Sequence, residues 1–181
     1  KIESSGERSE NVQEADRFPE HRSRTLFWRA CFASLTGDNT GAIRWLQTGV
    51  DEGEWFSPEQ LHGDPDLKPL QGVPEFEHIV AYCERRLAEA EKDVVPDRRV
   101  FVPQNIVPPF PLLIALHGHG VTQVYFETVH LEAWKPVVEK GWLLALPRAS
   151  QRAGPDSYAW RGTARSLQEV CDHYTEVCTQ Y

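Results

Sequence analysis

The chain has 181 residues, of which 40% are hydrophobic and 25% are charged, so it is long enough and apolar enough to bury a core. Its net charge is −8 and no segment concentrates lysine and arginine, which argues against a nucleic-acid partner. No apolar run is long enough to span a membrane and no signal peptide is recognisable, so we expect no membrane span.

The N-terminal segment differs in composition from the rest of the chain. The sequence begins at Lys1 and contains no methionine, so we expect a processed product or an excerpt of a longer protein. Residues 1–24 are polar, charged and nearly free of large apolar side chains. Such a segment buries too little surface to offset the entropy lost on ordering. We therefore expect a disordered lead-in over residues 1–24.

Two short helices are predicted between residues 25 and 50, on either side of a turn at Gly37-Asp38-Asn39. Their small and apolar residues resemble a tetratricopeptide repeat, whose helices pack closely; the residues are Ala30, Ala33, Gly37, Asp38, Ala42, Ile43, Trp45 and Leu46. The following stretch, LHGDPDLKPLQGVPEFEHIV, is similar to the segment that closes such repeat arrays. The resemblance implies a helical, tetratricopeptide-like module over residues 25–93, with a surface for a protein partner.

A third helix is predicted from Pro74, which suits the first turn of a helix. Its apolar residues fall on one face at helical spacing: Phe76, Ile79, Val80, Cys83, Leu87 and Ala90. Pro96 ends any continuation of this helix, so we place a domain boundary near residues 93–96.

Beyond this boundary the pattern alternates between strands and helices. Short apolar runs predict strands at 98–103, 112–118 and 141–147, and helices are predicted at 121–140 and 166–181. A loop rich in Gly, Pro and Ser connects residue 147 to about residue 162. Buried strands that alternate with helices favour an α/β fold with a parallel sheet over residues 97–181.

The strand at 112–118 ends in the sequence His-Gly-His-Gly, at residues 117–120. Gly118 and Gly120 permit a tight turn and a close approach to the backbone N–H groups. From the residues alone, three readings stay open: a metal site, a turn without chemistry, and one half of a catalytic site. The metal reading lacks a third convergent ligand, and zinc sites in proteins use three or more, so we expect no metal and no cofactor.

The order of the elements around this turn resembles the front half of an α/β-hydrolase, closest to the serine carboxylesterases and phospholipases. The resemblance covers residues 98–181 and implies that the His119 backbone N–H belongs to an oxyanion hole. It also implies that His117 braces the loop, that Gly118 and Gly120 shape it, and that Trp160 forms a wall for the substrate. The implied substrate is a small ester or another acyl compound.

The family pattern is incomplete in this sequence. None of its nine serines lies in Gly-x-Ser-x-Gly, where the family places the nucleophile. We therefore expect a hydrolase fragment that carries the oxyanion loop but is inactive alone, because the nucleophile and the other triad members are missing. The alternative is a non-catalytic interaction protein, in which the helical module is fused to a hydrolase-like remnant.

The four cysteines lie among apolar residues without paired spacing, at Cys31, Cys83, Cys171 and Cys178. This distribution favours reduced, buried thiols and hence a cytoplasmic compartment.

Overall fold

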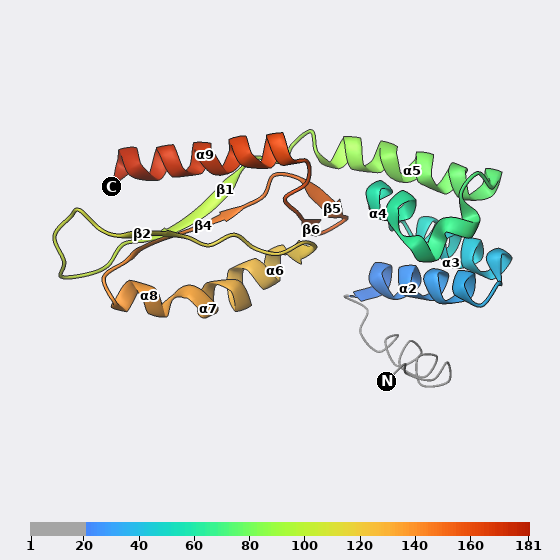
Figure 1. Cartoon of the computed structure of the whole chain (residues 1–181), viewed down its shortest axis with the longest axis horizontal. Coiled ribbons are helices and arrows are strands. Elements are labelled where there is room, and N and C mark those ends of the chain that lie inside the picture. Colours follow the sequence, from blue (N-terminus) through green and yellow to red (C-terminus); the bar gives the residue numbers. More distant parts are fainter. Residues whose placement is uncertain (1–20) are drawn as a thin grey trace. The chain divides into compact units, whose positions relative to one another are not determined.

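The computed structural model describes residues 21–181, which fall into two compact units divided between Glu89 and Ala90 (Figure 1). Most of the predicted lead-in lies outside the described residues, but its last part is helical because α2 begins at Arg22. The guanidinium of Arg22 makes two hydrogen bonds to Glu52, at 2.7 and 2.8 Å. Glu52 caps the C-terminus of α3, so this ion pair holds the start of α2 beside the end of α3.

The first unit is helical among its described residues. Its elements are α2 (Arg22–Leu35), α3 (Asn39–Asp51), α4 (Pro58–Gly63), the 3₁₀ helix η3 (Pro65–Leu70) and α5 (Pro74–Ala90). The predicted helical hairpin and the helix from Pro74 are thus confirmed. Asp38 caps α3 by accepting a hydrogen bond from the Gly41 N–H at 2.8 Å.

Large apolar side chains from every one of these elements fill the core of the first unit. Fully buried members include Leu26, Leu46, Leu61, Leu67, Leu70 and Phe76. The Phe56 ring packs against α3 at Gly49. A side chain does not fit at this position, because a Cβ there would lie 2.6 Å from the Phe56 ring. The helical hairpin is therefore closely packed at Gly49, where the absence of a side chain makes room for the Phe56 ring.

The second unit contains two small three-stranded sheets. The first has the order β1-β4-β2 and the second β3-β6-β5; their strands are β1 (Asp97–Phe101), β2 (Leu112–Ile114), β3 (Val121–Thr122), β4 (Leu143–Arg148), β5 (Arg152–Gly154) and β6 (Ser157–Tyr158). β2 runs parallel to β4, but β1 runs antiparallel to it. The prediction of a purely parallel sheet was wrong, because an apolar run indicates burial and not strand direction.

The central strand β4 is buried on both faces, as its continuous apolar sequence predicted. Its alternate side chains enter different cores. Leu144 and Leu146 pack with Phe126 and with apolar residues of the 131–138 segment. Leu143 and Ala145 pack with Val177 of α9 (Thr163–Gln180). The sheet therefore lies between α9 on one face and α6 (Gln123–Tyr125), α7 (Leu131–Trp134) and α8 (Pro136–Glu139) on the other (Figure 1).

The helix predicted over 121–140 is divided into short pieces. After β3 come α6 (Gln123–Tyr125), the π-helical turn η4 (Phe126–His130), α7 (Leu131–Trp134) and α8 (Pro136–Glu139). Pro136 begins α8 because its ring cannot donate the hydrogen bond that would continue α7. Similarly, the loop predicted at 148–162 contains β5 and β6; β6 pairs with both β3 and β5.

Helix α9 confirms the last predicted helix, but its orientation differs from the apolar pattern. Leu167 is 65% exposed and Tyr174 is 53% exposed, whereas the buried side chains are Glu169, His173 and Val177. Cys171 and Cys178 are exposed as well, so the prediction of four buried thiols holds for Cys31 and Cys83 alone. Leu167 and Tyr174 form an exposed apolar stripe on α9 that the second unit, residues 90–181, leaves uncovered.

Candidate functional site

The His-Gly-His-Gly turn follows the carboxyl end of β2 in the second unit. β2 ends at Ile114, and the Ala115 N–H still donates to the Ala145 carbonyl at 3.0 Å before the chain leaves the sheet. Gly120 has φ of +72°, a backbone conformation that favours glycine, and its N–H donates to the Tyr158 carbonyl at 3.0 Å. The turn is thus fixed at both ends, by β4 and by β6.

His117 is the buried centre of this turn, with 4% of its surface exposed. Its Nε2 accepts the Ala149 N–H at 3.0 Å, and its Nδ1 lies 2.8 Å from the Gly118 carbonyl. Because Nε2 accepts, the proton of the neutral ring sits on Nδ1, which donates to Gly118. Burial lowers the pKa of His117, so the neutral ring is favoured. The structure therefore places His117 as a brace between the turn and the chain that follows β4.

Aromatic side chains surround the His117 ring. Trp160 packs against it with ring centroids 5.3 Å apart, and Phe126 and His130 lie at 6.0 and 6.4 Å. The Nε2 of His130 lies 3.2 Å from the Ala115 carbonyl, which ties η4 to the start of the turn. Trp160, predicted as a substrate wall, is half-buried and lies directly on the brace.

His119 and Gly118 lie at the exposed tip of the turn. A Cβ on Gly118 would meet no atom within 4 Å, so open space surrounds this backbone. No acceptor within residues 21–181 pairs with the His119 N–H, whereas the N–H of Gly120 is already used. The four residues of the turn therefore divide into a buried brace, an exposed tip and an anchored end.

The loop that follows β4 is anchored by residues that the sequence did not single out. Glu169 of α9 is 7% exposed and accepts from both the N–H and the hydroxyl of Ser150, at 2.7 and 2.9 Å. Gln151 binds the Arg161 N–H at 3.1 Å and the Ser166 hydroxyl at 2.9 Å. Glu169 could have been identified from the sequence only as a glutamate on the buried face of α9, and the sequence does not reveal which face of α9 is buried.

A separate open groove of about 390 Å³ lies beside β4, β5 and β6. Arg148 and Arg152 place their guanidinium groups over the Tyr158 ring, at 4.5 and 4.4 Å from its centroid. Arg148 also lies 3.9 Å from the Asp97 carboxylate. The groove is lined by these two arginines together with Asp93, Asp97 and Tyr158, and its lining contains no serine, cysteine or histidine.

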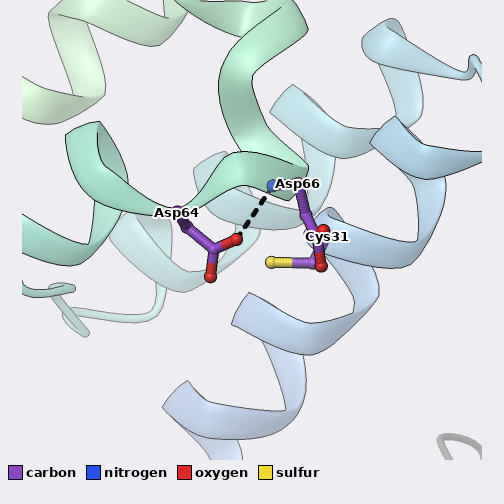
Figure 2. A group of neighbouring side chains, drawn as sticks. All are labelled: Cys31, Asp64 and Asp66. Carbon is purple, nitrogen blue, oxygen red and sulfur yellow. Dashed lines mark hydrogen bonds between the residues drawn. The ribbon is translucent and has the colours of Figure 1, made fainter.

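The side chains that could bind a metal ion converge away from the His-Gly-His-Gly turn. Both nitrogens of His117 are engaged in hydrogen bonds, so this ring is not available as a ligand. Within residues 21–181, potential ligand atoms converge instead at Cys31, Asp64 and Asp66 (Figure 2). The sequence did not reveal this cluster because Cys31 is far from the two aspartates along the chain.

Comparison with known proteins bears on the first unit. Residues 10–91 match the model of a family described as A/B hydrolase-like, N-terminal domain. This match supports an α/β-hydrolase-related N-terminal region, over the segment that resembles a tetratricopeptide repeat. The repeat resemblance itself is not confirmed and stays a prediction.

The other comparisons add less. No curated protein shows a significant match to the chain. A crystal structure at 2.75 Å resolution of an uncharacterized protein from Bacillus cereus ATCC 10987 is 24% identical, with a TM-score of 0.42. The alignment covers 96% of this chain and 56% of that one, so the chain spans little more than half of that protein's length. No helix within residues 21–181 has the length and apolar character needed to cross a membrane.

Proposed function

We propose that this chain provides the oxyanion-hole loop of a serine hydrolase that cleaves carboxylic esters or related acyl compounds. The family match at residues 10–91 supports a hydrolase-related protein. The proposal depends on one observation: the His119 N–H has no acceptor within residues 21–181. It lies at the tip of a turn that His117 fixes through its hydrogen bond with Ala149. A donor that is rigidly held and unpaired is what a developing oxyanion requires.

In this proposal the chain stabilises the negative charge that develops on the substrate and does not itself form or break a covalent bond. When a serine attacks an acyl carbon, the carbonyl oxygen gains negative charge, and the His119 N–H donates a hydrogen bond to it. The neutral ring of His117 keeps the turn in place by joining Gly118 to Ala149. Trp160, whose ring rests on His117, lines the side where the acyl or leaving group would lie. The nucleophile and the rest of the triad are proposed to lie outside these 181 residues.

The test compares two substitutions of His119 in the complete gene product, with p-nitrophenyl butyrate as the substrate. His119→Pro removes the N–H, whereas His119→Ala keeps it and removes only the side chain. We expect His119→Pro to lower kcat by about 10²–10³-fold with KM little changed, because one oxyanion donor contributes about that factor. His119→Ala should retain kcat within a few-fold.

Two results would overturn this assignment. Equal losses in both variants would place the effect in the imidazole, and full activity of a folded His119→Pro protein would exclude the N–H as a donor. Circular dichroism and the melting temperature of each variant establish that the fold is intact.

The alternative proposal is a non-catalytic interaction protein. It is supported by the exposed apolar stripe of α9, which includes Leu167 and Tyr174. It predicts that the wild-type gene product turns over no acyl ester at all, so the same assay separates the two proposals.

A further inference from the structure

Three side chains that bind divalent metals converge in the first unit. The Cys31 thiol and one carboxylate oxygen each from Asp64 and Asp66 lie within 4.8 Å of one another. Cys31 comes from α2, while the aspartates flank Pro65 at the start of η3 (Figure 2). The cluster therefore joins two elements that are distant along the chain.

The two carboxylates are only partly used by the fold. Asp64 caps η3 by accepting the Asp66 N–H on Oδ1 at 2.9 Å, which accounts for one of its oxygens. No lysine or arginine within residues 21–181 forms an ion pair with Asp64 or Asp66. Three carboxylate oxygens thus remain free to bind a cation.

The Cys31 thiol is the second, independent observation that points to a ligand. It is 7% exposed, pairs with no other residue among 21–181, and points between the two carboxylates (Figure 2). The other buried thiol of this unit differs, because the Sγ of Cys83 accepts the Phe56 N–H at 3.4 Å.

We propose that Cys31, Asp64 and Asp66 bind one zinc ion, through one sulfur and two oxygen atoms. Zinc accepts thiolate and carboxylate ligands in a tetrahedral arrangement, whereas Mg²⁺ and Ca²⁺ prefer oxygen alone. Three protein ligands leave the fourth position to water. Binding converts the Cys31 thiol to a zinc-bound thiolate and releases one proton to the solvent.

Little movement is needed to form this site. Ligand atoms around tetrahedral zinc lie roughly 3.3–3.8 Å apart, so side-chain shifts of about 1 Å bring the three groups into range. The ion would tie α2 to the start of η3, and it would stabilise the folded state because the unfolded chain lacks the preformed site.

The test uses the full chain with Cys171→Ser and Cys178→Ser, since these two exposed thiols would otherwise bind metal themselves. Co²⁺ is titrated as a spectroscopic substitute for zinc. We expect a thiolate-to-cobalt charge-transfer band that saturates at one equivalent and disappears when Zn²⁺ is added. Zinc should also raise the melting temperature.

Further substitutions in this background locate the site. Cys31→Ser should abolish the band, and Asp66→Asn should weaken cobalt binding at least about 10-fold, because loss of a residue that only supports a metal ligand already costs about that factor. Cys83→Ser is the matched control and should leave the titration unchanged. The proposal is overturned if no band forms, if the band survives Cys31→Ser, or if Asp66→Asn binds cobalt as tightly as its parent.

Discussion

His117 joins the backbone segments that follow β2 and β4, and it does so only as a neutral ring. Its Nε2 must accept from Ala149, so a proton on that nitrogen would break the contact. Burial lowers the pKa of His117 below the ordinary histidine value of 6.5, which keeps the ring neutral in the folded protein.

This contact makes the stability of the second unit dependent on pH. As pH falls below about 6.5, the unfolded chain takes up a proton at this histidine before the folded one does, so the free energy of unfolding decreases. His173, whose pKa burial also lowers, contributes in the same direction. Urea unfolding between pH 5 and 8 should show this decline, and a flat profile would contradict it.

Replacing His117 identifies its share of the effect. His117→Leu leaves the Ala149 N–H without its acceptor, so we expect a loss of about 1–3 kcal/mol in the free energy of unfolding at pH 7.5. The pH dependence should also become shallower, with the part due to His173 remaining. His119→Leu, at the exposed tip, is the matched control and should change stability by no more than about 0.5 kcal/mol.

Among the elements, α3 shows how close packing depends on a missing side chain. Gly49 lies inside a helix, where alanine is ordinarily the better residue by about 1 kcal/mol. The Phe56 ring, however, occupies the place of a Cβ at this position. At position 49, packing against Phe56 therefore favours glycine, although helix propensity favours alanine.

Gly49→Ala should accordingly destabilise the first unit by about 1–3 kcal/mol, as overpacking of a core does. Gly63→Ala, in α4, is the control, because a Cβ there would meet no atom within 4 Å. Chemical denaturation followed by circular dichroism measures both. A Gly49→Ala protein as stable as the wild type would show that α3 and Phe56 are less tightly packed than described.

The sequence predicted α2, α3 and α5 because their apolar residues recur at helical spacing and their ends carry proline, glycine and aspartate, but it did not predict α4 or η3. It predicted the buried strand β4 because the run Leu143–Leu146 is apolar without interruption. It could not predict the direction of β1, or the pairing of β6 with β3, because these depend on contacts between distant segments. The same limit hid the candidate metal ligands.

Helix α9 is the clearest failure of pattern reading. Part of its apolar run faces outward, at Leu167 and Tyr174, while Glu169 and His173 are buried beside Val177. The buried face is explained by Ser150, whose two donors require an acceptor from α9. The position of the His-Gly-His-Gly turn, by contrast, was predicted from its two glycines.

At the scale of the whole molecule, the second unit leaves surfaces without a partner among residues 90–181. β2 is an edge strand, so one row of its backbone hydrogen-bonding groups is open. The stripe on α9 adds exposed apolar area at Leu167, Tyr174 and Tyr181. Both features are typical of surfaces that associate with further protein.

We therefore expect the isolated chain of 181 residues to self-associate as its concentration rises. Leu167→Glu together with Tyr174→Lys should raise the concentration at which this begins several-fold, because both side chains are exposed and their loss leaves the core intact. Sedimentation velocity over a concentration series measures the effect. A monodisperse wild-type chain at high concentration would count against an uncovered interface.

We propose that this chain supplies the oxyanion-hole loop of a hydrolase site whose nucleophile lies outside these 181 residues. Labelling of the complete gene product with a serine-directed fluorophosphonate, followed by peptide mapping, tests it most directly. The account predicts one labelled serine, located in a Gly-x-Ser-x-Gly segment outside these 181 residues, and no labelling of the isolated chain. A labelled serine within residues 1–181, or a complete gene product that does not react, would contradict it.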